Sequence, residues 1–280
     1  RTKRPWFKNR MSVLIKTFVP KPLRTLIRNP KAVIKYLIIT SIQLIIKPLG
    51  FFVQQVGSDY IDPGLTAKAA KKKGMSICEY LEDKENDHRK KGRRNRIIKA
   101  IEQFGVFNYC DNILEIGAGT GMYLEEVIKK ANPKMYEIYE THRGWAGFLK
   151  KTYQNKADYH LLIHDADGRT LANTSTASCQ LVHVHGVFVY LSFLHTFSYL
   201  TEIARVLAPN GFLVFDCFIE SCFTRMTLHS WLNSTWRFPV IISEQLLLEF
   251  TRSLGLNLHD RFQEIYGESH VEYFIFKKNG

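Results

Sequence analysis

Acidic residues are missing from the first 58 positions, although this stretch carries 12 of the chain's 39 lysine and arginine residues. The other 222 residues hold 27 basic and 26 acidic side chains, so the net charge of +13 comes almost entirely from the N-terminal arm. A basic chain often binds nucleic acid. Here the body has no net positive charge to offer a phosphate backbone, so nucleic acid is not the expected partner.

Cysteine is scarce, with five residues and no Cys-x-x-Cys pair. This spacing argues against a disulfide framework and against a zinc site, and it fits a reducing, cytoplasmic compartment. The carboxylates Asp216 and Glu220 have no neighbours that complete a metal-binding set, so we expect no metal.

A long apolar run is also missing from residues 1–58. The uncharged stretch from Tyr36 to Ile46 has 11 residues, whereas a spanning helix needs ~20. Asn29 and Pro30 are a good helix start, and Pro48 breaks the apolar helix that follows. Two interpretations stay open: the helix lies in a membrane interface, which would make the protein peripheral on the inner face of a membrane, or it packs as a flap on the body.

Residues 59–94 are predicted to form a charged, helical connector. The basic block at 88–94 is expected to be a solvated helix face or loop, with contact to phosphate or anionic lipid as the alternative. From residue 95 onward strands and helices alternate, which predicts right-handed βαβ units and a parallel sheet covered on both faces. Residues 256–267 and 270–278 are separated by only a short turn, so we expect an antiparallel pair at one edge of that sheet.

The segment NILEIGAGTGMYLEEV, residues 112–127, places Gly117, Gly119 and Gly121 between a predicted strand and a predicted helix. That junction lies at the carboxyl ends of the strands, where doubly wound sheets bind ligands, and glycine lets a ligand approach the main chain. A dinucleotide fingerprint would need a glycine where Met122 stands. Glu115, just before the turn, suits a ligand that carries positive charge.

The stretch LEIGAGTG (114–121) resembles the first motif of class I S-adenosylmethionine-dependent methyltransferases, and the resemblance extends over residues 95–280. It implies an α/β, Rossmann-like class I methyltransferase fold, with a mostly parallel seven-stranded sheet and an antiparallel C-terminal edge strand. Residues 207–215, LAPNGFLVF, are similar to the family's turn before the fifth strand, with Asn210 in place of the usual first glycine. The phrases YEIYE and HGVFVYL resemble, much more weakly, a bacterial subgroup thought to modify sugars or glycolipids.

The resemblance implies S-adenosylmethionine as the cofactor and assigns its contacts. Glu140, at the end of the second strand, is expected to take the two ribose hydroxyls. Asp165 is expected to contact the adenine amino group beside the backbone of Ala166, with Asp167 as the second choice. The full set of expected cofactor-binding residues is Glu115, Gly117, Ala118, Gly119, Thr120, Gly121, Glu140, Thr141, Asp165, Ala166 and His183.

Methyl transfer from a sulfonium is an in-line displacement, so the protein must position the acceptor and, for a hydroxyl, remove a proton. His183 and His185 in LVHVHGVFVYL (181–191) have the same strand parity. His185 lies at the strand end, so it is the expected catalytic base, and Tyr190 is expected to orient the acceptor; a structural hydrogen-bonding role for His185 is the alternative. The expected substrate-binding residues, which could equally be packing aromatics, are Tyr123, Phe188, Trp231 and Trp236.

The sequence therefore predicts an enzyme that transfers a methyl group to a small-molecule, sugar or glycolipid acceptor, as O-methylation near a membrane surface. One alternative is a methyltransferase acting on RNA or protein, although no Asn/Asp-Pro-Pro-Tyr motif for exocyclic amines follows the fourth strand. The other alternative is a non-catalytic module that only binds S-adenosylmethionine.

Overall fold

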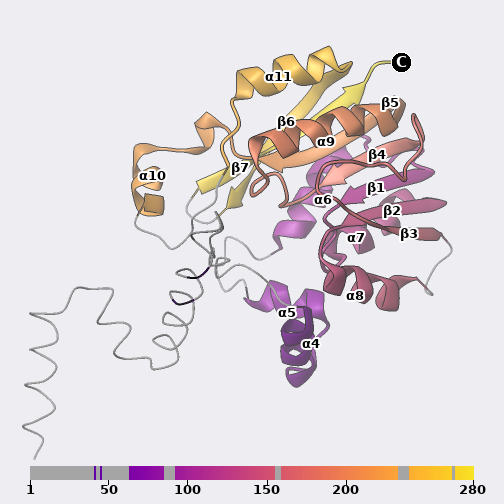
Figure 1. Cartoon of the computed structure of the whole chain (residues 1–280), viewed down its shortest axis with the longest axis vertical. Helices are drawn as coiled ribbons and strands as arrows, with labels where there is room; N and C mark the ends of the chain where they lie inside the picture. The colour runs from indigo at the N-terminus through magenta and orange to yellow at the C-terminus, as the bar shows by residue number, and fades with distance from the viewer. Residues whose placement is uncertain are drawn as a thin grey trace, which may run out of the picture. The chain divides into compact units, whose positions relative to one another are not determined.

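The computed structural model describes residues 63–84, 92–154, 159–232, 240–266 and 269–280, together with Ser41 and Ile45. The chain divides into two units, residues 1–56 and 57–280. The predicted cationic arm, residues 1–58, lies outside the described residues except for those two positions. The elements labelled in Figure 1 belong to the second unit. In the described part of the chain, no helix combines the length and apolar character needed to cross a bilayer.

A seven-stranded sheet forms the centre of this unit, in the spatial order β3-β2-β1-β4-β5-β7-β6. The five strands β1 to β5 run parallel, whereas β7 pairs antiparallel with both β5 and β6. The predicted parallel sheet with an antiparallel C-terminal edge is thus confirmed. The strands are β1 (Asn112–Ile116), β2 (Met135–Glu140), β3 (His160–Asp165), β4 (Cys179–Val184), β5 (Leu207–Cys217), β6 (Leu256–Tyr266) and β7 (Ser269–Lys278).

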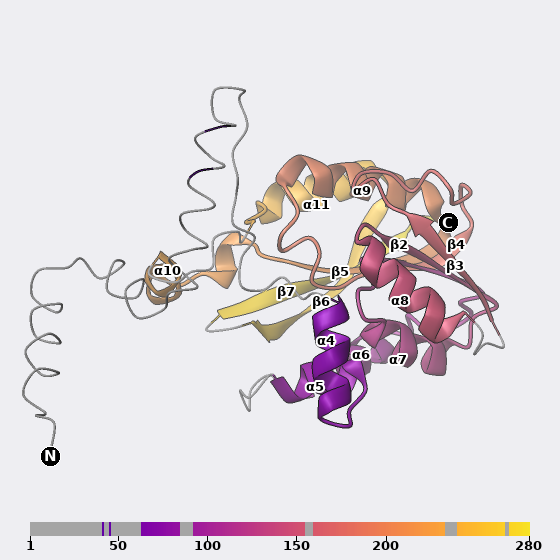
Figure 2. The ribbon, with the colours of Figure 1, turned by 60° about the horizontal axis from the view of Figure 1, so that its bottom comes forward.

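Helices cover both faces of the sheet. Figure 2 shows α9 and α11 on one side and α6, α7 and α8 on the other. The helices are α4 (Pro63–Lys72), α5 (Ile77–Lys84), α6 (Arg93–Gln103), α7 (Met122–Ala131), α8 (Arg143–Tyr153), α9 (Phe193–Val206), α10 (Arg225–Leu232) and α11 (Glu244–Ser253), with one 3-10 turn, η2 (Glu220–Cys222).

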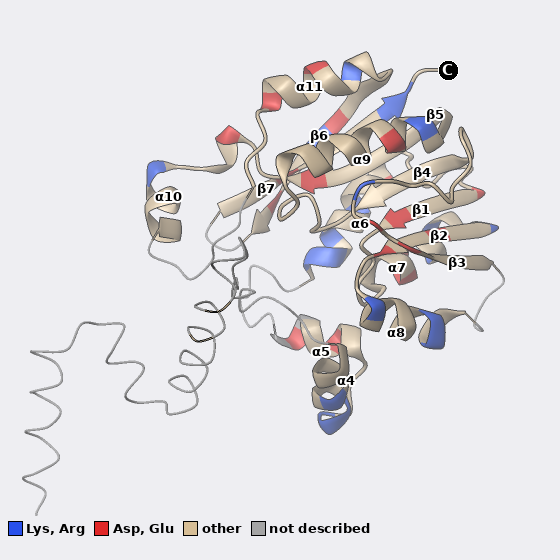
Figure 3. Ribbon diagram, in the orientation of Figure 1, with Lys and Arg blue, Asp and Glu red and all other residues tan. Residues whose placement is uncertain are grey.

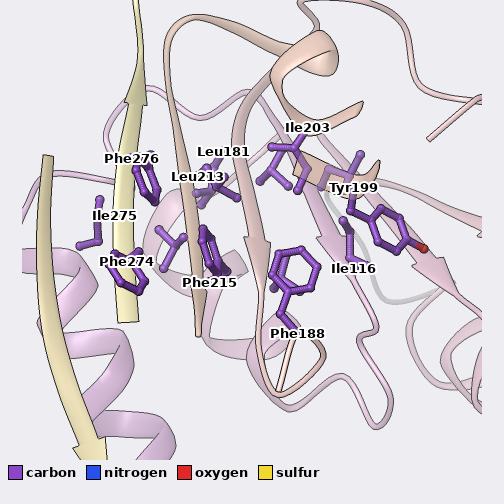
Figure 4. Close-up of a cluster of buried hydrophobic side chains, with 14 of the residues drawn as sticks. Ile116, Leu181, Phe188, Tyr199, Ile203, Leu213, Phe215, Phe274, Ile275 and Phe276 are labelled. Carbon is purple, nitrogen blue, oxygen red and sulfur yellow. The ribbon is translucent and has the colours of Figure 1, made fainter. Parts of the chain in front are cut away.

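The sheet face under α9 and α11 is aromatic. Phe215 of β5 lies 5.2 Å from the ring of Phe188, and its ring stacks with those of Phe274 and Phe276 on β7 (Figure 4). Phe188 is fully buried in this layer. The structure therefore corrects its expected place at the substrate site: Phe188 points into the core, on the far side of the sheet from the polar residues described below.

The described part of the predicted connector contains the helices α4 and α5, which pack on the sheet domain, and the start of α6. Ala70, Ile77 and Tyr80 of α4 and α5 form a small apolar cluster with Trp145 of α8. The charged residues of α4 gather at its C-terminal end, which is blue in Figure 3. All five cysteines of the chain are buried free thiols.

Candidate active site

The glycine turn joins β1 to α7, and each of its three glycines has a positive φ. A Cβ atom on Gly117 would lie 2.5 Å from Val187 Cγ2, and one on Gly121 would lie 2.7 Å from Tyr153 Cε2. Apart from Gly119 itself and its two chain neighbours, no described residue has an atom within 4 Å of the Cβ position of Gly119. The outer glycines are thus needed for packing of the chain on itself, and the middle one leaves the backbone open to a ligand.

Glu140 lies beside this open backbone. Its carboxylate accepts hydrogen bonds from the amides of Gly119 at 2.9 Å and His142 at 2.8 Å. A carboxylate has about four lone-pair sites, so Glu140 retains capacity for two further donors, such as a pair of ribose hydroxyls. The strand register places Glu140 opposite Asp165, whose side chain is exposed at the end of β3. These residues fit S-adenosylmethionine across the ends of β1, β2 and β3.

The side chain of Asp167 forms hydrogen bonds within its own loop. Its carboxylate accepts hydrogen bonds from the amides of Arg169 and Thr170 and from the Thr170 hydroxyl. Of the two acids considered for the adenine contact, Asp165 is therefore the one with an uncommitted carboxylate among the described hydrogen bonds. The backbone of Ala166 lies next to it, half-buried.

Glu115 and His183 lie beneath the strand ends, each 1% exposed. Tyr136 of β2 joins them: its hydroxyl donates to Glu115 at 2.8 Å and lies 2.6 Å from His183 Nε2. Burial raises the pKa of Glu115 to about 8 and lowers the pKa of His183 to about 3. Both were expected to touch the cofactor, whereas here their shared partner is Tyr136, inside the protein.

His185 lies past the end of β4, next to the glycine turn. The ring of Tyr123 stacks on it with centroids 3.8 Å apart, and its Nδ1 lies 3.3 Å from the Tyr273 hydroxyl. Its Nε2 is buried and has no hydrogen-bond partner within the described ranges. Burial, together with the charges of His183 and Arg93, keeps the pKa of His185 well below its usual value. The imidazole is therefore neutral at physiological pH and is available as a proton acceptor.

Asp216 and Arg93 complete the polar side of the sheet. Asp216, the last residue but one of β5, has no exposed surface, and one of its carboxylate oxygens accepts a hydrogen bond from the Gly186 amide at 2.7 Å. The other oxygen lies 4.0 Å from Nη2 of Arg93, in the first turn of α6. Burial raises the pKa of Asp216 to about 6, against the opposing effects of Arg93 and of the Gly186 amide.

The remaining expected residues take varied positions. Tyr190 is 43% exposed, and its hydroxyl contacts that of Tyr266. Trp231 packs edge-on against Phe218 and Phe223, whereas Trp236 lies outside the described residues. Ala118 and Thr120 are buried in the glycine turn and Thr141 is exposed.

Within the described ranges, no group of three or more His, Cys, Asp or Glu side chains is placed to hold a metal ion.

Sequence reasoning missed three members of this site: Arg93, Tyr136 and Tyr273. Strand alternation carried a signal for Tyr136, because it lies four residues before Glu140 and so faces the same side of β2. Arg93 was assigned to a solvated basic block, although its side chain is only 18% exposed. Tyr273 joins the site because β7 pairs it with Asp216, a register that the sequence does not specify.

Comparisons with known proteins agree with this geometry. A family model described as a methyltransferase domain matches residues 114–215, from the middle of β1 to β5. No curated protein matches the sequence.

Solved structures share the fold at low sequence identity. The N-methyltransferase NodS from Bradyrhizobium japonicum WM9, in complex with S-adenosyl-L-homocysteine, is 14% identical with a TM-score of 0.54, over 77% of this chain and 99% of that one. Magnesium protoporphyrin IX methyltransferase (ChlM) from Synechocystis PCC 6803, also with bound S-adenosylhomocysteine, is 9% identical with a TM-score of 0.53, over 66% and 82%. A putative sarcosine dimethylglycine methyltransferase from Galdieria sulphuraria is 12% identical with a TM-score of 0.52, over 66% and 85%.

Motif, topology and family match thus lead to one conclusion. The chain has the class I methyltransferase fold, its residues 114–215 match a methyltransferase domain, and its glycine turn with Glu140 fits S-adenosylmethionine as the cofactor.

Proposed function

We propose that this enzyme methylates a hydroxyl group of a sugar, of a glycolipid or of a related small molecule, with His185 as the proton acceptor. The observation that carries the proposal is the neutral, buried imidazole of His185, whose Nε2 has no hydrogen-bond partner among the residues that the structure describes. A hydroxyl becomes a good nucleophile only as its proton leaves, and a neutral imidazole is a suitable base for this step.

The chain supplies positioning and proton removal. S-adenosylmethionine, when bound, supplies a methyl group that is already activated on a sulfonium. The glycine turn and Glu140 are proposed to hold the donor, and the packing of Val187 against Gly117 brings the segment after β4 to the same turn. Tyr123 stacks on His185 and fixes the plane of the imidazole. Tyr190, partly exposed on the same segment, is proposed to orient the acceptor.

The acceptor's location is inferred from charge. The 12 basic residues and missing acids of residues 1–58 favour an anionic membrane surface, and a membrane-bound acceptor would be a glycolipid. The neutral body of the chain gives no support for RNA as the substrate.

Methyl-labelled S-adenosylmethionine tests the proposal directly. The purified enzyme is incubated with the labelled donor and an extract of the source cells, and the products are partitioned between organic and aqueous phases. We expect label in the organic phase, and its loss in a His185→Ala variant that still binds the donor. Label confined to the aqueous phase contradicts a lipid-linked acceptor, and full activity of the variant contradicts the assignment of His185.

A further inference from the structure

Five polar side chains meet where β4 and β5 end beside the first half of β7, under the first turn of α6. This group, named here the Arg93 cluster, consists of Arg93, Tyr123, His185, Asp216 and Tyr273. The guanidinium of Arg93 also lies 4.8 Å from the centre of the Tyr266 ring, as a cation–π pair. The cluster lies beside the proposed base, so an inference about its ligand rests on the proposed function.

Three polar atoms of the Arg93 cluster are buried without a hydrogen-bond partner in the described part of the chain: Arg93 Nε, His185 Nε2 and Asp216 Oδ2. Buried polar groups are nearly always paired, because an unpaired group loses its hydration without compensation. Asp216 itself has no exposed surface. The 4.0 Å between Arg93 Nη2 and Asp216 Oδ2 is too long for a direct hydrogen bond. It fits a pair bridged by a third group.

The chemistry of each atom defines what this third group must offer. Arg93 Nε–H only donates, and the carboxylate oxygen of Asp216 only accepts. The Tyr273 hydroxyl also hydrogen-bonds Tyr123. In the tautomer in which His185 can accept a proton from a ligand, Nδ1–H donates to the Tyr273 oxygen and Nε2 carries the lone pair. The ligand must therefore provide two donors and one acceptor.

Charge excludes the simplest ionic ligands. A carboxylate or phosphate would pair with Arg93 but would be repelled by Asp216, and it has no proton to give to His185. An ammonium group would pair with Asp216 but would be repelled by Arg93. Two adjacent neutral hydroxyl groups meet all three needs, since each donates one hydrogen bond and also accepts.

We propose that the Arg93 cluster recognises a vicinal diol, the arrangement found on sugar rings and polyols. One hydroxyl bridges Arg93 Nε and Asp216 Oδ2, and its neighbour donates to His185 Nε2. The second oxygen is the one methylated: its C–O bond to the methyl carbon forms as the S–C bond breaks, the electron pair of the broken bond stays on sulfur, and the hydroxyl proton goes to His185. Arg93 and Asp216 bind the diol and so select the acceptor.

Periodate tests the diol with the unaltered enzyme, because it cleaves the carbon–carbon bond of vicinal diols. An extract of the source cells is oxidised and then quenched with ethylene glycol, and a matched extract receives periodate that was quenched beforehand. With labelled S-adenosylmethionine, we expect oxidation to lower incorporation by roughly tenfold or more, because a cleaved diol loses its hydrogen bonds to a charged pair. The label should also resist mild alkali, as an ether does and a methyl ester does not.

If an extract oxidised with periodate is labelled as strongly as the control extract, or if alkali releases the label as methanol, the proposed recognition of a vicinal diol is wrong. Methyl transfer by the enzyme would still stand. If no component of the untreated extract is labelled, the proposed function fails instead. The two failures are therefore distinguishable.

Two substitutions test the residues. Asp216→Asn and Arg93→Gln should each lower methyl transfer by roughly 10- to 100-fold, the loss expected for a hydrogen bond to a charged group. Their affinity for S-adenosylmethionine, measured by calorimetry, should stay within about twofold, since their partner is the acceptor. Arg96→Gln is the matched control, because Arg96 lies on the same helix and pairs with Glu264.

A parallel loss of donor affinity in Arg93→Gln would place Arg93 on the cofactor and overturn its role here. Unchanged methyl transfer in Asp216→Asn would show that Asp216 does not bind the acceptor. If a variant unfolds, the periodate experiment still decides the question of the diol.

Discussion

Glu140 is held in place by two backbone amides, those of Gly119 and His142, so its side chain cannot turn away from the donor site without breaking both hydrogen bonds. We expect Glu140→Gln to weaken S-adenosylmethionine binding by roughly tenfold or more, because an amide places an N–H group against one of these donors and offers fewer lone pairs to the ribose. Calorimetric titration measures this. Asp111 lies just before β1, is exposed and forms an ion pair with Lys134. The control variant Asp111→Asn should leave the affinity for S-adenosylmethionine unchanged. Wild-type affinity in Glu140→Gln would remove Glu140 from the donor site.

Glu115 makes a separate prediction about pH. Its pKa is raised to about 8 in the folded protein by burial, and the groups that face it are Tyr136, His183 and Glu140. The unfolded chain loses this proton near pH 4.5, so the folded state holds the extra proton between these two values. Stability contributed by the neutral carboxyl is therefore complete below pH 4.5 and is lost as the pH rises through 8.

The window from pH 7 to 8 isolates this effect. The pKa of Asp216, about 6, and that of His183, about 3, both lie below it. Urea unfolding should show wild-type stability falling by up to about 1.4 kcal/mol over this unit of pH, with a flatter profile in Glu115→Gln. Glu126→Gln, a change at a partly exposed side chain on α7 that pairs with Lys129, serves as the control. Equal slopes in wild type and Glu115→Gln would show that Glu115 is already ionised in the fold.

Single residues also show where sequence reasoning ends. Glu140 and Asp165 were predicted from their positions at strand ends, and the register brings them together. Arg93 could not be found this way, because a basic run of four or more residues gives no sign that one member turns inward. Its place beside Asp216, which is 123 positions away in the chain, is set only by the tertiary structure.

At the scale of elements, different glycines of the turn from β1 to α7 serve packing and ligand binding. A Cβ on Gly121 would collide with Tyr153 and Leu149 of α8, whereas a Cβ on Gly119 meets open space. We expect Gly121→Ala to lower the free energy of unfolding by about 1–3 kcal/mol through overpacking, in addition to about 1–2 kcal/mol for its own positive φ. Gly119→Ala should cost only about 1–2 kcal/mol for its positive φ but should weaken S-adenosylmethionine binding more strongly.

Thermal unfolding with and without S-adenosylmethionine separates these effects. Each variant is the control for the other, since both place alanine in the left-handed region of the backbone. If Gly119→Ala binds the donor normally, the open backbone at residue 119 is not where the ligand approaches.

The order of elements was readable from the sequence because alternation of apolar segments with turns determines βαβ units. The pairing of β7 between β5 and β6 was predicted only as an antiparallel edge, since two adjacent strands can join a sheet in either order. That order decides which residues meet: with β7 next to β5, Tyr273 lies opposite Asp216 and enters the Arg93 cluster. Side-chain position within the site therefore depends on tertiary register, which local pattern does not contain.

At the scale of the whole molecule, the net positive charge lies almost entirely in the first of the two units of the chain. All seven strands and the aromatic layer lie within residues 57–280, and this unit carries a net charge close to zero. Residues 1–58 hold 12 basic side chains and no acids. Each lysine or arginine near an anionic bilayer contributes about 1 kcal/mol of attraction, so the arm is the part of the sequence suited to hold the enzyme at a membrane.

Deletion of residues 1–58 tests this division. We expect the shortened chain to remain folded and to bind S-adenosylmethionine as the full chain does, because the donor site begins at β1. Sedimentation with vesicles of anionic and of neutral lipid should show the full chain bound to the anionic vesicles only, with binding lost in the shortened chain and weakened by salt. An insoluble shortened chain would instead show that the arm covers apolar surface of the body, as a flap would. Binding to anionic vesicles that survives the deletion would place the membrane contact on the methyltransferase domain itself.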